Sequence, residues 1–199
     1  PTSAPTSADV AFKLPNADGS SGQFMKTDGS GNLAFATLPA AGITMATQWR
    51  VTSDFTIGTG DGEYVIASNW ESADTYNRGR IGSDLTESSG IFSFPSTGIY
   101  RIFAITPFNN TSANNWRSQI GIQVTLDNSS YATTAVAKQS LSTPAEQSGS
   151  MSCEYLFDVT NISTHKFKIS VRTYADNVKF QGDTNRNETS ISVIRLGDT

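Results

Sequence analysis

Hydrophobic and polar residues alternate along much of the chain after residue 45, which is the pattern of half-buried β-strands. Between residues 165 and 173, Phe167, Ile169 and Val171 occupy one face, and serine and basic residues occupy the other. Successive side chains of a strand point to opposite faces, so this stretch predicts a strand with one face in a core. The ranges that we expect to be strands are 46–52, 63–69, 98–106, 120–126, 131–139, 151–159, 165–173 and 188–196.

About eight strands at this spacing, with no window of helical period between them, predict an all-β fold. We expect an antiparallel two-sheet sandwich of the jelly-roll type over residues 46–199, the knob domain, preceded by a short extended N-terminal stalk over residues 1–45. The composition agrees, because serine and threonine make up about a quarter of the 199 residues. Such residues favour turns and short strands over long helices.

The strand at 98–106 differs from the others because it is apolar on both faces. Tyr100 and Ile102 lie on one face, and Phe103 and Ile105 lie on the other. A strand that is apolar on both faces must be covered on both, and the rest of the chain is too polar to supply a third layer. We therefore expect the face that carries Arg101, Phe103 and Ile105 to pack against other subunits.

Residues 1–45 contain a short repeat with a period of ten. Asp18-Gly19-Ser20 recurs as Asp28-Gly29-Ser30, and each turn is followed by an apolar stretch, first at Phe24 and then at Leu33 and Phe35. A turn and a short strand, repeated once, predict a β-hairpin, and two short strands are not stable alone in water. One interpretation is a flexible leader. The other is a stalk in which Phe24, Leu33 and Phe35 pack against neighbouring copies of the chain or against another protein.

Composition and charge exclude several classes of function. The net charge of −4 and the pI near 4.9, without a cluster of lysine or arginine, argue against nucleic acid as the main partner. No stretch approaches the roughly 20 apolar residues of a membrane-spanning helix, so we expect no membrane insertion. The single cysteine, Cys153, is expected to be a small buried hydrophobe, and the single histidine, His165, an exposed turn residue.

With one cysteine and one histidine, the sequence offers no catalytic triad, no metal site and no cofactor motif. We therefore expect a protein that is not an enzyme. Acidic residues such as Asp61, Glu63, Asp74 and Asp84 leave a glycosidase pair open as a weaker alternative, although such residues are more often solvated turn residues.

Trp70, Tyr76 and Trp116 are candidate ligand-binding residues because they lie in or beside polar segments that interrupt the strands. An aromatic ring can stack on the face of a sugar while amides bind its hydroxyl groups. Rim packing between subunits is the alternative role for the same rings. With no basic cluster or metal motif, the expected ligand is a neutral or weakly charged glycan. The segments that carry these aromatics, together with Phe55 and Phe108, are expected to be loops, namely 53–62, 70–80 and 107–117.

Two patches of the sequence resemble the jelly rolls of the complement globular heads and the tumour necrosis factors. The first is Gly-Ile-Phe-Ser-Phe-Pro-Ser-Thr-Gly-Ile-Tyr-Arg-Ile-Phe-Ala-Ile at residues 90–105, in which an aromatic strand ends in a turn between proline and glycine. The second, residues 180–197, is similar to the closing strand of that fold. The resemblance spans roughly residues 46–199 and implies a homotrimer, in which Phe103 and Ile105 lie near the threefold axis.

The stretch from Leu14-Pro15 to Phe35, with its two Asp-Gly-Ser turns, resembles a stretch common in bacteriophage fibre and virion-surface proteins. Followed by a trimeric knob, it implies a structural protein at the virion surface, either a fibre or a decoration protein on a phage capsid or tail. The implied partners are other copies of the chain, virion proteins bound through the N-terminal segment, and a host-surface glycan. The alternatives are a lectin-like recognition module of the same fold and, less favoured, a small polysaccharide depolymerase.

Overall fold

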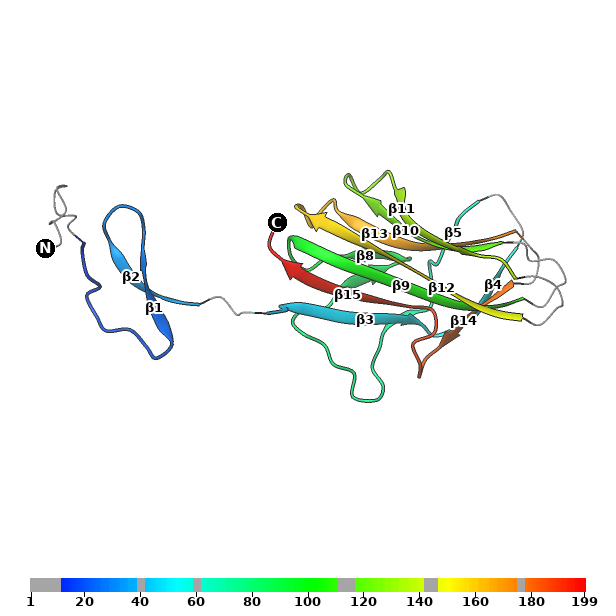
Figure 1. The fold of residues 1–199 in the computed structure, drawn as a ribbon, viewed down its shortest axis with the longest axis horizontal. Coiled ribbons are helices and arrows are strands. Elements are labelled where there is room, and N and C mark those ends of the chain that lie inside the picture. Colours follow the sequence, from blue (N-terminus) through cyan, green and yellow to red (C-terminus); the bar gives the residue numbers. More distant parts are fainter. Residues whose placement is uncertain (1–11, 39–41, 59–61, 111–116, 142–146, 175–177) are drawn as a thin grey trace, which may run out of the picture. The chain divides into compact units, whose positions relative to one another are not determined.

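The chain divides into two compact units, Pro1–Gly42 and Ile43–Thr199, which we call the leader and the knob (Figure 1). A computed structural model describes residues 12–38, 42–58, 62–110, 117–141, 147–174 and 178–199. The regular secondary structure of these ranges is β-strand, and none of them holds a helix able to cross a membrane. The all-β prediction is confirmed for this part of the chain.

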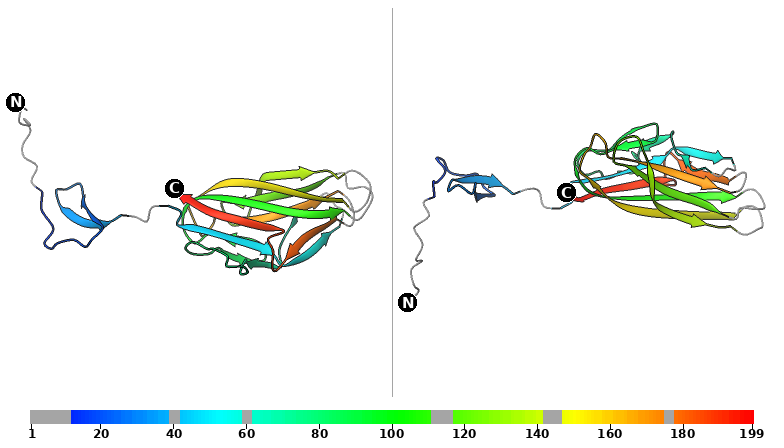
Figure 2. Two further views of the ribbon diagram at one scale, coloured as in Figure 1. Left: turned by 60° about the horizontal axis from the view of Figure 1, so that its bottom comes forward. Right: turned by 90° about the horizontal axis from the view of Figure 1, so that it is seen from above.

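The knob is a sandwich of two antiparallel sheets (Figures 1 and 2). The larger sheet consists of β3 (Met45–Val51), β4 (Ser53–Ile57), β6 (Trp70–Ser72), β9 (Gly98–Asn110), β12 (Gln147–Val159), β14 (Val178–Asp183) and β15 (Ser190–Gly197). The smaller sheet consists of β5 (Tyr64–Val65), β7 (Thr86–Ser88), β8 (Ile91–Ser93), β10 (Ser118–Thr125), β11 (Ala132–Gln139) and β13 (Lys166–Thr173).

The order of strands in each sheet differs from their order in the sequence. The larger sheet runs β4-β14-β9-β15-β3-β6. Strand β12 also pairs with β9, over the full length of both strands. The smaller sheet runs β11-β10-β13-β8-β7, and β5 also pairs with β13. Several strands that are consecutive in the sequence, such as β9 and β10 or β12 and β13, therefore lie in different sheets, as expected of the predicted sandwich.

One hydrophobic core fills the space between the two sheets. Alternate residues of the strands face it, and Ile120, Ile122 and Phe167 of the smaller sheet have no exposed surface. Aromatic rings contribute much of its volume, and Phe92 stacks on Phe167 with the ring centroids 4.9 Å apart. The described core residues run from Met45 onward, so the knob has a core of its own.

Strand β9 has two apolar faces, as predicted. Tyr100 and Ile102 are fully buried in the core, whereas Phe103 and Ile105 point to the outer face of the larger sheet and are half-buried. The strand begins at Gly98, whose φ of 145° lies in a region that side chains rarely adopt. A Cβ at this position would also lie 2.6 Å from the Gly197 carbonyl oxygen, so only glycine fits here.

The stretches expected to be loops contain strands instead. Segment 53–62 includes β4, segment 70–80 begins with β6, and β9 continues to Asn110. Phe108 is fully buried, because it continues the inward-facing series of Tyr100 and Ile102, and Phe55 stacks on Phe180 with centroids 5.3 Å apart. The loop assignment of Phe55 and Phe108 is therefore wrong. The expected strand at 63–69 is reduced to Tyr64–Val65.

The prediction for Cys153 is confirmed and the one for His165 is wrong. Cys153 is 8% exposed on the inner face of β12, and burial raises the pKa of its thiol to about 11. His165 is only 9% exposed, and its ring stacks on Phe157 with centroids 5.6 Å apart. It lies two residues before Phe167, so the alternation of β13 turns it toward the core.

The leader contains the predicted hairpin, formed by β1 (Gln23–Thr27) and β2 (Leu33–Thr37). In the turn between them, Asp28 Oδ1 accepts hydrogen bonds from the backbone N–H groups of Ser30 (2.8 Å) and Asn32 (3.1 Å). The ring of Phe35 lies against Gly19, where a Cβ would be only 2.6 Å from the ring. No described residue of the leader is fully buried, so the hairpin has no core of its own.

Candidate functional site

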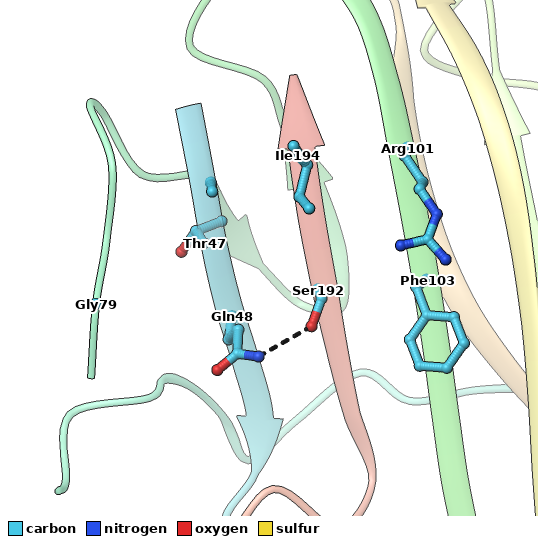
Figure 3. Close-up of a pocket in the computed structure, with 8 residues that line it drawn as sticks. Thr47, Gln48, Gly79, Arg101, Phe103, Ser192 and Ile194 are labelled. Carbon is cyan, nitrogen blue, oxygen red and sulfur yellow. Dashed lines mark hydrogen bonds between the residues drawn. The ribbon is translucent and has the colours of Figure 1, made fainter. Parts of the chain in front are cut away.

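A hollow of about 460 Å³ lies on the outer face of the larger sheet (Figure 3). Two rows of paired residues form its floor. Arg101 pairs with Ile194, which pairs with Ala46, and Phe103 pairs with Ser192, which pairs with Gln48. The hollow is lined by Ala46, Thr47, Gln48, Gly79, Arg101, Phe103, Ser192 and Ile194.

The charge of Arg101 is neutralised within this face. Its Nε donates a hydrogen bond of 3.0 Å to Glu154 Oε2 on the neighbouring strand β12. The guanidinium carbon lies 5.6 Å from the centroid of the Phe103 ring, within the range of a cation–π contact. The cation therefore lies between a carboxylate and an aromatic ring, and it contributes little net charge to the surface.

The polar side chains of the hollow are also satisfied. Gln48 Nε2 donates a hydrogen bond of 3.1 Å to Ser192 Oγ, which is the dashed line in Figure 3. Ile105 lies on the same outer face, between Ser190 of β15 and Ser152 of β12, but outside the hollow. The structure thus brings the three residues of the predicted interface, Arg101, Phe103 and Ile105, onto one face of one strand.

The three leader residues expected to pack in a stalk lie on two faces of the hairpin. Phe35 pairs with Met25 and shares a face with Leu33, whereas Phe24 pairs with Ala36 on the opposite face. Leu33 and Phe35 are half-buried, and Phe24 is 38% exposed. The hairpin therefore has apolar side chains on both faces.

The candidate ligand-binding aromatics have different environments. The Trp70 ring lies edge-on to Phe92 with centroids 5.1 Å apart, and its Nε1 donates a 2.8 Å hydrogen bond to the Ile66 carbonyl oxygen. Tyr76 is 86% exposed in a turn and has a φ of 55°. Trp116 lies outside the described residues. Of the two described rings, Tyr76 has the free surface that stacking on a sugar requires.

A buried ion-pair network at the edge of the larger sheet has no signal in the sequence pattern. Arg50 is 2% exposed, and it donates hydrogen bonds to Glu71 Oε1 (2.7 Å), Asp74 Oδ1 (2.8 Å) and Thr75 Oγ1 (3.0 Å). These partners follow Arg50 by 21 to 25 positions in the sequence. The network ties the segment after β6 to β3, next to Gly79 at the rim of the hollow.

Asp84 is the second centre of this network. Its carboxylate accepts hydrogen bonds from Ser72 Oγ (2.6 Å), Thr47 Oγ1 (2.5 Å) and Trp49 Nε1 (2.9 Å), and it pairs with Arg80 at 3.2 Å. Burial alone would raise the pKa of this carboxyl, but the hydrogen bonds outweigh burial and hold the pKa well below its ordinary value. The charged form of Asp84 is therefore part of the folded structure.

The described positions of Cys153 and His165 do not suit nucleophilic catalysis. Cys153 and His165 are both buried, and the ring nitrogens of His165 face the hydroxyls of Thr160 and Thr164 at 3.3 and 3.1 Å. Within the described ranges, no three His, Cys, Asp or Glu side chains gather where they could hold a metal ion.

Comparison with known proteins gives a fold and no family. No family model matches the chain, and no curated protein matches it. Among solved structures, Eiger TNF from S. frugiperda is similar with a TM-score of 0.57 and 14% identity, over 79% of this chain and 96% of that one. Murine APRIL at pH 5.0 is similar with a TM-score of 0.55 and 14% identity, over 76% and 98% of the two chains. The knob therefore has a jelly-roll fold like that of tumour necrosis factors.

Proposed function

We propose that this protein is a virion structural protein, in which a homotrimeric knob is displayed on a bacteriophage capsid or tail through the N-terminal leader. The observation that carries the proposal is the outer face of the larger sheet. There Phe103 and Ile105 alternate with fully buried residues of the same strand, and both are half-buried in a single copy. Covering such side chains with a second copy removes apolar surface from water, which stabilises the assembly.

The chemistry of this face suits contact with further copies of the chain. The centres of protein interfaces are poor in uncompensated charge and rich in aromatic residues and arginine. Here Arg101 is paired with Glu154, and Gln48 is hydrogen-bonded to Ser192. Burying the face therefore leaves few polar groups without a partner.

The leader supports the attachment role. Its described residues include Phe12, Leu14 and Phe24, which are 54%, 65% and 38% exposed. A hairpin without a core gains stability when another chain covers such residues. In the proposal that chain is a neighbouring leader or another virion protein, and the protein is not an enzyme. Binding of a host-surface glycan belongs to the same proposal, with Tyr76 as the described aromatic that is free to stack.

Light scattering of the purified chain at micromolar concentration tests the trimer. The wild type is expected to have three times the chain mass of 21.3 kDa. Phe103→Asp is expected to give folded monomers, because it places an unpaired charge in the desolvated interface. Val136→Asp is the matched control, since Val136 is 46% exposed on the smaller sheet. A monomeric wild type, or equal loss of mass in both variants, contradicts the proposed interface.

The location on the particle requires a separate experiment. Antibodies against the knob, used for immunogold labelling of intact phage, are expected to decorate the capsid or tail. Deletion of residues 1–42 is expected to release the knob from the particle while the knob stays folded. If the particles carry no label although the purified protein is trimeric, the virion role is wrong. A trimeric recognition module outside the virion is then the better interpretation.

A further inference from the structure

We propose that the knob binds an acidic polysaccharide through the outer face of the smaller sheet. Lys138 of β11 and Lys166, Lys168 and Arg172 of β13 occupy outward positions on this sheet, and we call this surface the basic face. Their neighbours in sequence, such as Phe167, Ile169 and Val171, point into the core. The inference goes beyond the proposed function and depends on the knob alone.

In the part of the knob that the structure describes, the lysines of the basic face differ from most other cations because they are not paired with carboxylates. Lys138, Lys166 and Lys168 form no ion pair with a carboxylate of the described residues. All three belong to the smaller sheet, although the chain as a whole has a net charge of −4. Among the described residues, the cations that lie within 4.0 Å of a described carboxylate include Arg50, Arg78, Arg80, Arg101, Lys179, Arg186 and Arg195.

Strand register sets the spacing of these charges. Lys138 and Arg172 both pair with Gln119, so they lie on either side of β10 at one level of the sheet. Lys168 and Lys166 lie four and six positions before Arg172 on β13, toward the opposite end of the strand. With strands about 4.8 Å apart and about 3.3 Å per residue, the charges extend over roughly 20 Å. That length suits an extended polymer with repeated negative charges better than a single small anion.

A hollow of about 310 Å³ lies beside Lys166, with polar side chains among its lining. Ser88, Ser93 and Asn128 contribute to its lining, together with Thr86. Hydroxyl and amide side chains can both donate to and accept from sugar hydroxyls, and a lysine ammonium pairs with a carboxylate. The volume is within the range of small-ligand sites. The hollow therefore combines the groups that one acidic sugar residue requires.

Lys166 and Lys168 of the basic face are held in place by neutral groups. Lys166 Nζ donates hydrogen bonds to Ser93 Oγ (2.9 Å) and the Ile162 carbonyl oxygen (3.5 Å), which leaves one of its three N–H groups for a ligand. Lys168 Nζ lies 3.6 Å from the centroid of the Tyr131 ring. Neither contact removes the positive charge, and both reduce the entropy that the lysines lose when they bind.

Three carboxylates near these lysines accept hydrogen bonds from neutral groups. Glu63 accepts hydrogen bonds from Gln119 Nε2 (3.0 Å) and Thr133 Oγ1 (2.8 Å), and also from Gln123. Asp127 Oδ1 accepts from the backbone N–H groups of Ser129 and Ser130, both at 2.8 Å. Glu87, which also borders the hollow, accepts from the Gly90 N–H at 2.6 Å. These acids keep their negative charge, but they are held by neutral donors and form no ion pair with the three lysines among the described residues.

A polysaccharide fits the basic face better than nucleic acid does. The hollow offers hydroxyl and amide groups for sugar hydroxyls, whereas duplex recognition needs a larger excess of positive charge than this chain carries. The basic face also lies on the side of the sandwich opposite Phe103 and Ile105. A trimer formed through those residues leaves three basic faces exposed, and three weak contacts on one polymer raise the overall avidity.

Binding of the full-length chain to immobilised polygalacturonate, a linear polymer of carboxylated sugars, tests the inference. The wild type is expected to bind at about 0.01 M salt and to lose binding at about 1 M, where the Debye length falls to roughly 3 Å. Lys166→Gln with Lys168→Gln is expected to weaken binding about tenfold. Glutamine at position 166 can still donate to Ser93, which protects the fold.

The matched control is Lys179→Gln with Arg186→Gln, which removes the same charge from residues paired with Asp54 and Asp183. We expect this control to bind within about twofold of the wild type, because its charges lie away from the basic face. Thermal unfolding of both double variants verifies that they are folded. Equal weakening in both, no binding of the wild type to polygalacturonate, or equal binding to neutral dextran or to duplex DNA would each overturn the inference.

Discussion

Arg50 donates a 2.7 Å hydrogen bond to Glu71 although only 2% of the arginine side chain is exposed. The two residues come from neighbouring strands of the larger sheet, since Arg50 of β3 pairs directly with Glu71 of β6. Asp74 and Thr75 occupy further N–H groups of the same guanidinium. A buried charge with this many partners fixes β6 and the segment that follows it against β3.

Arg50→Ala is expected to lower the free energy of unfolding by about 3–5 kcal/mol, because it leaves Glu71 partly buried without its cation. Urea denaturation at neutral pH measures the change. Arg186→Ala is the control, since Arg186 is 70% exposed and pairs with Asp183 at the surface, where such a pair contributes at most about 1 kcal/mol. Equal small losses in the two variants would show that the network does not stabilise the knob.

Asp84 predicts a loss of stability in acid. The pKa of its carboxyl in the folded protein is well below the ordinary value, so the unfolded chain binds more protons as the pH falls through about 4. The stabilisation from Asp84 is present above that pH and decreases as the pH falls toward the folded pKa. Urea midpoints at about pH 7, 5 and 3 are expected to decrease in the wild type.

The variant Asp84→Asn separates this residue from other acids. It is expected to be less stable than the wild type by about 2–4 kcal/mol at neutral pH, because Arg78, Arg80 and Trp49 lose a charged acceptor. The difference from the wild type is expected to shrink as the pH falls. Asp158→Asn, an exposed change on β12, is expected to follow the wild-type curve. A difference that stays constant with pH would rule out Asp84 as the source.

Tyr76→Ala and Trp70→Ala are expected to separate recognition from stability. Tyr76 is 86% exposed, so its loss changes the free energy of unfolding by less than about 0.5 kcal/mol and weakens adsorption to host cells. Trp70→Ala removes the contact with Phe92 and the hydrogen bond to Ile66, which costs about 2–4 kcal/mol. Normal adsorption of a folded Tyr76→Ala trimer would exclude Tyr76 from the binding site.

Limited proteolysis with trypsin is expected to remove residues 1–26 of the leader and to leave the knob intact. Trypsin has exposed cleavage sites at Lys13 and Lys26 of the leader, and the leader has no buried residue in its described part. The knob keeps its core from Met45 onward, so its melting temperature is expected to be nearly unchanged after cleavage. Mass spectrometry identifies the fragment. A knob that unfolds once the leader is cut would contradict the division into two units.

Local alternation was sufficient to predict the long strands. The period of two is visible wherever one face meets the core and the other meets water, as in residues 165–173 around Phe167. The same period predicted two apolar faces for β9, with Phe103 and Ile105 on the outer one. Strands β4 and β6 were missed because they are short and lie among polar residues, and because an edge strand depends on its partner more than on its own composition.

The sequence by itself determined the all-β class, the burial of Cys153, the hairpin of the leader and the two faces of β9, because each depends on neighbours a few positions apart. Only the tertiary structure decided which distant residues meet. It joined Arg50 to Glu71 and gathered hydrogen bonds on Asp84. It also placed Lys138 and Lys168 on one face of a chain whose sequence has no basic cluster. Pairing across a sheet depends on strand order and register, and the long-range packing that sets them is not encoded in any short window.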